Sequence, residues 1–168
     1  MDIAAILKSG HTKSNTMRVV RYIGDDAQKF GELIEIFFHG DYRMTQRAAW
    51  PVSYCIKDHP ELIDPYLNKC VDKLLDKTAH VAVRRNVARL LQYIDVPKKL
   101  AGKVYSHCID LIDDMNEPVA VRAFAITAAT RIAKTEPALI AELQMVVKKH
   151  LPHTTIAFQK RSRDILSR

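Results

Sequence analysis

The sequence predicts an all-α fold in which consecutive helix pairs stack, and an internal repeat is the first of three observations behind this prediction. Residues 70–72 read Cys-Val-Asp and residues 108–110 read Cys-Ile-Asp, at an offset of 38 residues. Residues 81–84 and residues 119–122 both read Val-Ala-Val-Arg at the same offset. A period of roughly 35–45 residues that contains two helical patterns is typical of an α-solenoid.

The second observation is the placement of proline. Pro60, Pro97 and Pro137 each stand where the first helix of a predicted pair begins. Proline is favoured in the first turn of a helix, because the N–H that it lacks would have no partner there. These prolines therefore separate one predicted helix pair from the next.

The third observation is the apolar spacing in the second helix of each pair. Val83, Val87, Leu90, Leu91 and Ile94 recur at intervals of three and four residues, which places them on one helical face. The residues 38 positions further along repeat this face. One pair cannot cover it alone, so neighbouring pairs are expected to stack and share a core. The alternation typical of strands is missing, and we expect essentially no sheet.

The length of 168 residues is that of a single domain. We expect residues 1–24 to form an N-terminal cap or a partial repeat. The predicted helix pairs that follow cover residues 25–58, 60–94, 97–134 and 137–168. The second helices of these pairs are expected near residues 42–58, 80–94, 118–134 and 154–167.

Composition indicates a soluble globular protein, with 48% hydrophobic and 27% charged residues. No signal peptide and no bilayer-spanning apolar stretch is visible, so we expect no membrane association. The cysteines at positions 55, 70 and 108 fall inside helical patterns, which predicts buried, reduced thiols and a cytoplasmic protein. The net charge of +7 favours polyanionic partners, including nucleic acid and acidic protein surfaces.

The order of a proline-opened helix, a short turn and a second helix that opens with Val-Ala-Val-Arg resembles HEAT and HEAT-like (armadillo-type) repeats. The resemblance covers about residues 25–168. It implies a right-handed α-α superhelix, a solenoid of about four helix pairs, with a concave face made by the second helices. Such a face usually holds a partner, so the resemblance implies a binding scaffold and no enzyme.

The resemblance also implies a polar ladder between successive turns. HEAT repeats form it between an arginine and an aspartate six residues earlier. In this chain Thr78 lies six residues before Arg84, and Asn116 lies six residues before Arg122. Both can accept a hydrogen bond and cap a helix, but neither is aspartate. These four residues form the expected ladder.

A cluster of arginine and aromatic residues is the predicted partner-binding site. Arg47, Trp50 and Tyr54 recur at helical spacing in the helix expected over residues 42–58. Arg85, Arg89 and Gln92 form the equivalent strip of the next second helix. Arginine with aromatic residues is the composition favoured at binding hot spots, which predicts a protein or acidic peptide partner. The alternative is that Trp50 packs between repeats and the arginines pair with acids.

Two other functions stay open as alternatives. Arginines of the second helices could track a phosphate backbone without reading bases, namely Arg47, Arg84, Arg85, Arg89, Arg122 and Arg131. HEAT-like folds also include DNA glycosylases, whose chemistry needs a carboxylate beside the groove aromatics, and here Asp58 is two turns from Trp50. The sequence contains no phosphate loop, catalytic motif or metal-ligand set. We therefore expect no catalytic residue, cofactor or metal.

Overall fold

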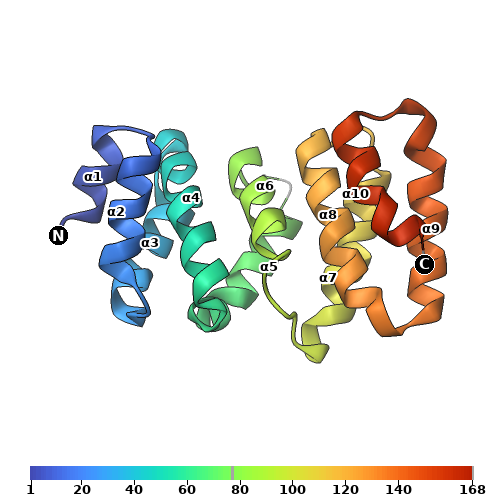
Figure 1. Ribbon diagram of the computed structural model, residues 1–168, viewed down its shortest axis with the longest axis horizontal. Coiled ribbons are helices and arrows are strands. Elements are labelled where there is room, and N and C mark those ends of the chain that lie inside the picture. Colours follow the sequence, from blue (N-terminus) through green and yellow to red (C-terminus); the bar gives the residue numbers. More distant parts are fainter. Residues whose placement is uncertain (77, 168) are drawn as a thin grey trace. The chain divides into compact units, whose positions relative to one another are not determined.

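The computed structural model describes residues 1–76 and 78–167, with only the backbone of His153, and these residues are helical without strands (Figure 1). The α-helices are α1 (Ile3–Ser9), α2 (Lys13–Ile23), α3 (Ala27–His39), α4 (Tyr42–Asp58), α5 (Leu67–Leu75), α6 (Val81–Leu90), α7 (Lys98–Asp113), α8 (Val119–Ile132), α9 (Pro137–His150) and α10 (Ile156–Leu166). The 3₁₀ helices are η1 (Pro60–Tyr66), η2 (Ala133–Thr135) and η3 (Leu151–His153).

Side-chain caps decide where most of the N-terminal helices begin. Asp2, Thr12, Asp26 and Asp41 precede α1, α2, α3 and α4, and each side chain accepts a hydrogen bond from a backbone N–H of the first turn. His80 does the same for α6 through its Nδ1 atom. A cap of this kind satisfies an N–H group that has no partner inside the helix.

The chain divides into two compact units, Met1–Ile94 and Asp95–Arg168. In the first unit α2 packs against α4, and α4 packs against α6, so the second helices of three successive pairs are neighbours. Helix α3 packs against α4 and contributes a fully buried face of Phe30, Leu33, Ile34 and Phe37. The predicted apolar positions from Val83 to Ile94 are buried as well, on α6 as far as Leu90 and beyond its end at Leu91 and Ile94.

The second unit is built around α8. This helix packs against α7 and α10, and α9 packs against α7 and α10. Val121, Ala125, Ala128 and Ala129 are buried, as the repeat predicts, and Phe158 of α10 is fully buried. The short alanine side chains allow α7 and α10 to approach α8 closely, because little volume separates the helix backbones.

The observed elements follow the predicted ones with local differences. The helix over residues 42–58 is observed with those bounds, whereas α6 ends at Leu90 and not near residue 94. The first helix after Pro60 begins as the 3₁₀ helix η1, with Pro65 inside it, and α5 starts only at Leu67. Pro65 explains this, because proline has no N–H for an α-helical hydrogen bond.

Two glycines differ in how closely other atoms approach them. A Cβ at Gly40, between α3 and α4, would lie 2.6 Å from the carbonyl oxygen of Ile36 and 2.9 Å from the Cβ of Met44. A Cβ at Gly102, inside α7, would meet nothing within 4 Å. The turn between α3 and α4 therefore requires glycine for steric reasons, and α7 does not.

We expect opposite effects from alanine at these two positions. Gly102→Ala should raise the free energy of unfolding by about 1 kcal/mol, because alanine is the better helix former. Gly40→Ala should lower it by about 1–3 kcal/mol, because the added methyl overpacks the turn. Urea unfolding followed by circular dichroism measures both values. Equal shifts of the same sign would contradict the steric assignment.

Candidate functional site

One face of α4 carries a continuous row of basic and aromatic side chains, which we call the α4 stripe. Its members recur at alternating intervals of four and three residues and so share one helical face. They are Arg43, Arg47, Trp50, Tyr54 and Lys57. The row covers about 21 Å along the helix, at 1.5 Å per residue. Three of the predicted partner-binding residues, Arg47, Trp50 and Tyr54, thus lie in one line.

Two arginines of α6 lie beside the α4 stripe. The Nη2 atom of Arg85 donates to the Oε1 atom of Gln46 on α4, at 2.6 Å. Arg89, one turn further along α6, lines an open hollow of about 260 Å³. The other residues around this hollow are Ser53, Tyr54, Lys57 and Tyr93. In the first unit Arg85 therefore contacts α4, and Arg89 lies beside Tyr54.

Trp50 lies on the surface and does not pack between repeats. Its side chain is 39% exposed, and its ring meets the ring of His11 edge to face, with 4.5 Å between the centroids. His11 comes from the segment between α1 and α2. The indole therefore keeps an open face on the α4 stripe, next to a side chain that the sequence did not connect with it.

Gln92 is a correction to the predicted site. It is only 8% exposed, and its Nε2 atom donates to the carbonyl oxygen of Arg89 at 2.9 Å. The reason is that α6 ends at Leu90, and Gln92 lies in the turn that follows instead of on a continued helical face. Gln92 is therefore no part of the exposed surface.

Arg47 has a structural role besides its place in the stripe. Its Nη1 atom donates to the carbonyl oxygens of Leu7 and Lys8, at 3.0 and 2.9 Å. These carbonyls belong to the last turn of α1, where a helix has no internal donors left. Arg47 thus fastens α1 to α4 with one of its three guanidinium nitrogens.

The arginines beside and on the stripe have no acidic partner in the described part of the chain. Among the residues that the structure describes, no ion pair involves Arg43, Arg47, Arg85 or Arg89. Lysines of the first helices, in contrast, pair with carboxylates: Lys29 with Asp26, Lys69 with Glu35 and Lys149 with Asp113. None of the described acidic residues therefore neutralises these four arginines by an ion pair.

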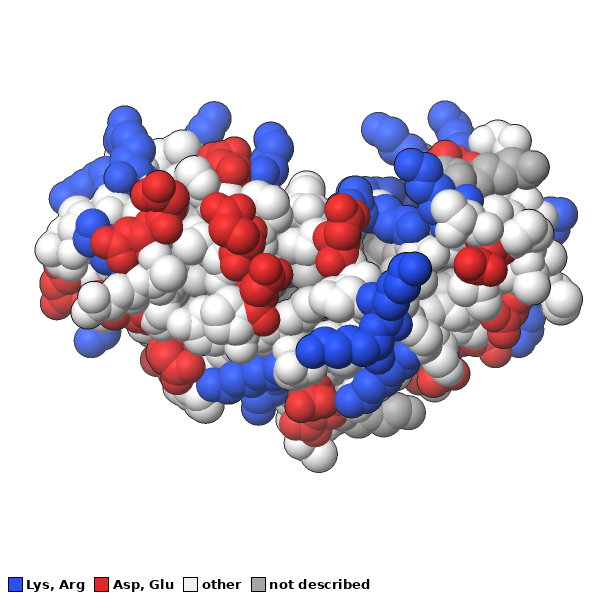
Figure 2. Space-filling view, turned by 90° about the horizontal axis from the view of Figure 1, so that it is seen from below, with Lys and Arg blue, Asp and Glu red and all other residues white. Residues whose placement is uncertain are grey.

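Arginine and acidic residues are distributed unevenly between the first and the second helices of the pairs. Every arginine among the described residues lies on a second helix, that is, on α2, α4, α6, α8 or α10. The only acidic residues on these five helices are Asp58 and Asp164, both near C-terminal ends. The α-helices between them carry lysine and acids but no arginine. Figure 2 shows Lys and Arg in blue and Asp and Glu in red on one face of the molecule.

The structure offers no sign of a reactive or metal-binding centre in its described part. Burial raises the pKa of the thiols of Cys55, Cys70 and Cys108 to about 12, so these thiols stay protonated and poorly nucleophilic. No group of three or more histidine, cysteine or acidic side chains is close enough to hold a metal, counting the described residues alone. Within the same residues, every helix is too short or too polar to cross a lipid bilayer.

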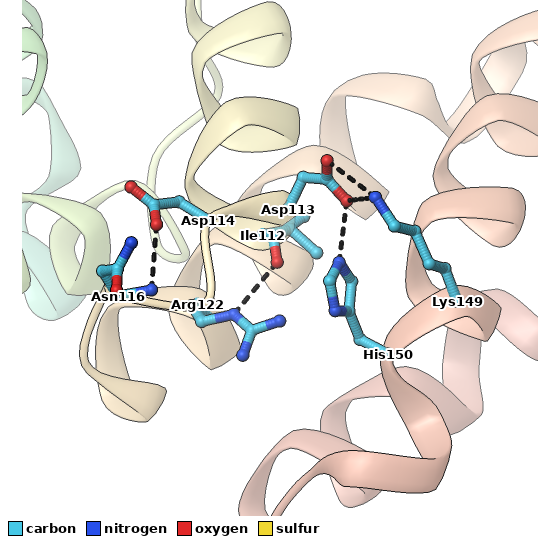
Figure 3. Close-up of polar contacts among 7 residues, drawn as sticks. All are labelled: Ile112, Asp113, Asp114, Asn116, Arg122, Lys149 and His150. Atoms are coloured by element: carbon cyan, nitrogen blue, oxygen red, sulfur yellow. Dashed lines mark hydrogen bonds and ion pairs between the residues drawn. The ribbon is translucent and has the colours of Figure 1, made fainter.

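Contacts are observed for three of the four predicted ladder residues, Thr78, Asn116 and Arg122. Arg122 is 2% exposed, and its Nε atom donates to the carbonyl oxygen of Ile112 at 3.0 Å (Figure 3). Asn116 donates its backbone N–H to Asp114 at 2.8 Å, and Thr78 donates to Asp76 in the same way. The carboxylates two residues before Thr78 and Asn116 thus order these turns. The sequence repeat could have identified these two carboxylates, since Asp114 follows Asp76 by 38 residues.

Arg122 is held by a carbonyl and a ring instead of by an acid. Its guanidinium carbon lies 5.0 Å from the centroid of the Phe158 ring, a cation–π contact with α10. Burial lowers the pKa of this guanidinium. Its Nη2 atom has no hydrogen-bond partner among the described residues. Arg122 therefore links α7, α8 and α10 and is not available to a ligand.

Asp113 joins the ends of α7 and α9. Its carboxylate accepts hydrogen bonds from Nζ of Lys149 at 2.7 and 3.0 Å, and its Oδ1 atom lies 2.7 Å from Nε2 of His150 (Figure 3). Hydrogen bonds from Lys149 and then His150 lower the pKa of Asp113. The ionised carboxylate is therefore the form that the folded chain stabilises.

Replacing Arg122 should destabilise the second unit. Arg122→Met leaves the Ile112 carbonyl without its donor, and we expect a loss of about 1–3 kcal/mol in the free energy of unfolding. Arg131→Met is the matched control on the same helix, because Arg131 is exposed and pairs with a fully exposed Asp95, and it should change stability by less than about 0.5 kcal/mol. Chemical unfolding of both variants measures the difference. Equal stability of the two variants would contradict the role given to Arg122.

The Asp113 contacts should make stability depend on pH. Because the folded pKa of Asp113 is lowered, its contribution is complete above the unfolded carboxyl pKa of about 3.9 and is lost as the pH falls through the folded pKa. Asp113→Asn should therefore lower the melting temperature at pH 7, and this effect should shrink as the pH falls below about 3.9 towards the lowered pKa of the folded chain. Asp110→Asn, which removes an exposed carboxylate from the same helix, is the control and should show a much smaller difference at pH 7.

A family model described as "HEAT repeat domain" matches residues 3–168. Comparison with curated proteins gave no match, and comparison with solved structures gave none either. The family match agrees with the order of helix pairs in both units and confirms the predicted all-α helical-repeat fold. Because it covers nearly the whole chain, the chain belongs to the HEAT repeat family.

Proposed function

We propose that this chain is a non-enzymatic scaffold that binds an acidic segment of a protein partner on the α4 stripe and the adjacent α6 arginines. The observation that supports this most directly is that Arg43, Arg85 and Arg89 make no ion pair with the described residues, on a surface that also carries the exposed ring of Trp50. Arginine, tryptophan and tyrosine are the residues most often found at binding hot spots. Carboxylates of a partner would supply the acidic groups that the surface lacks.

The dimensions of the stripe suit a short peptide segment. A length of about 21 Å corresponds to roughly six residues of extended chain at 3.3 Å per residue. The hollow around Arg89 offers Tyr54 and Tyr93 as flat apolar walls beside Lys57. An acidic segment that also carries apolar side chains therefore fits both the charge and the surface.

The structure favours a local acidic segment over an extended phosphate track. Among the arginines proposed to follow a phosphate backbone, Arg122 is buried and Arg131 pairs with Asp95 at 2.6 Å. Sequence-independent nucleic-acid binding remains the second candidate, because the second helices carry almost no acidic residue. Counting described residues, neither hollow along the stripe is lined by a carboxylate, which argues against a glycosylase-type site beside Trp50.

Removing the α6 arginines should weaken binding of an acidic peptide. We expect Arg85→Ala combined with Arg89→Ala to lower the affinity for a fluorescein-labelled peptide of alternating glutamate and leucine by at least about tenfold. The matched control, Lys98→Ala with Lys99→Ala, removes the same charge from the exposed start of α7 and should change affinity by less than about twofold. Fluorescence anisotropy measures both affinities.

Two results of this measurement would count against the proposal. Equal losses in the two double variants would mean that only the net charge matters. A labelled DNA duplex that binds more tightly than the peptide, with affinity falling steeply between 50 and 200 mM salt, would favour the second candidate. Melting temperatures of the variants show whether a loss of binding comes from unfolding.

A further inference from the structure

The N-terminal end of the α4 stripe forms a hollow of about 410 Å³, which we call the Arg85 pocket. Its lining residues are His11, Tyr42, Arg43, Gln46, Arg47 and Arg85. Three guanidinium groups thus surround one open space, and none of the described carboxylates lines it. The second hollow on the stripe contains a single arginine, Arg89, and one lysine. Positive charge is therefore concentrated at one end of the stripe.

Neutral groups hold two of these guanidiniums in place. Arg47 uses Nη1 for the carbonyl oxygens of Leu7 and Lys8, and Arg85 uses Nη2 for the side-chain oxygen of Gln46. Each contact occupies one nitrogen of the planar fork, and the other nitrogens make no hydrogen bond to the described residues. A guanidinium that is oriented in advance loses less entropy when it binds an anion.

Two aromatic contacts order the rim of the pocket. The ring of Tyr42 lies 4.7 Å from the ring of His80, the residue that caps α6. The ring of His11 meets Trp50 at 4.5 Å. The pocket is thus built from α4, α6 and the segment before α2, and each of its sides is held by a contact to a neighbouring element.

We propose that the Arg85 pocket binds a phosphate monoester, a phosphorylated serine or threonine, carried by the acidic segment of the partner. This inference rests on the proposed function and names the chemical group that the α4 stripe recognises. A phosphate monoester carries close to two negative charges and offers three acceptor oxygens, and arginine clusters bind it through charge-assisted hydrogen bonds. A single carboxylate would leave most of the charge of Arg43, Arg47 and Arg85 uncompensated.

The geometry favours a monoester over the diester backbone of a nucleic acid. A diester carries one charge per phosphate and needs cations at regular intervals along its path. Along the stripe the cations instead form two separate groups. Three arginines line the Arg85 pocket, Arg89 and Lys57 line the second hollow, and Trp50 and Tyr54 lie between Arg47 and Lys57. A point concentration of arginine fits one dianionic group within an otherwise acidic peptide.

Trp50 reports on occupation of the pocket. It is the only tryptophan of the chain, and its ring touches His11, which lines the pocket. A phosphate beside His11 changes the charge next to the indole and should change its fluorescence. The natural chain therefore contains its own probe.

The test uses three synthetic peptides that differ at one position, with phosphoserine, glutamate or serine between the same glutamate and leucine residues. The full chain is titrated with each peptide, and Trp50 fluorescence and isothermal calorimetry give the affinity. We expect the phosphoserine peptide to bind about tenfold more tightly than the glutamate peptide. Arg85→Gln should remove this preference, and Arg89→Gln, one turn along α6 and outside the pocket, should keep it. Arg43→Gln is a second pocket variant, whose exposed side chain makes no ion pair with the described residues.

The outcomes separate this inference from the proposed function. Equal affinity for the phosphoserine and glutamate peptides would overturn the phosphate site and leave acidic-segment binding in place. Failure of all three peptides to bind would overturn both. If Arg85→Gln and Arg89→Gln reduced the preference for phosphoserine over glutamate equally, the preference would come from the overall positive charge and not from the Arg85 pocket, which would overturn the inference. A single-stranded oligonucleotide that binds more tightly than the phosphoserine peptide and competes with it would assign the pocket to nucleic acid and overturn the inference.

Discussion

The apolar face of each second helix can be covered only by neighbouring helices, and the rest of the structure depends on this constraint. In the first unit it places α2, α4 and α6 next to one another, and in the second unit it places α8 between α7 and α10. Helix α4 buries one side in this way and leaves Arg43, Trp50 and Lys57 of its other side exposed. The α4 stripe is such a side, because the buried positions from Thr45 to Ile56 alternate with it at helical spacing.

Lysine and arginine are also divided between the first and the second helices of the pairs. Lysines of the first helices lie next to acids of the same or a neighbouring helix and form exposed ion pairs, which contribute little to stability. Arginines occupy the second helices, where acids are nearly missing from the described residues. The guanidinium group is suited to bidentate contacts with carboxylates and phosphates, and lysine is not. The placement of arginines on helices with few acids is the basis for proposing that the first unit binds an acidic partner.

Arginines that look alike in the sequence have different roles in the folded chain. Arg122 is buried between helices, Arg47 fastens α1 with one nitrogen, and Arg131 pairs with Asp95. Arg85 and Arg89 lie half-buried beside the stripe without an acidic partner among the described residues. The repeat relates Arg84 to Arg122 by sequence, yet only the packing of Phe158 of α10 on Arg122 explains the burial of the latter.

The sequence by itself determined the all-α class, the order of helix pairs, the buried apolar faces and the line of Arg47, Trp50 and Tyr54. These features follow from periodicity, helix caps and prolines. Such signals act over a few residues and can therefore be identified in the sequence. Only the tertiary structure decided that Trp50 meets His11, that Gln92 is buried, and that Arg43, Arg47 and Arg85 surround one hollow. Such contacts join residues up to about 40 positions apart, and they depend on where helices end and how closely neighbours pack, which no local pattern specifies.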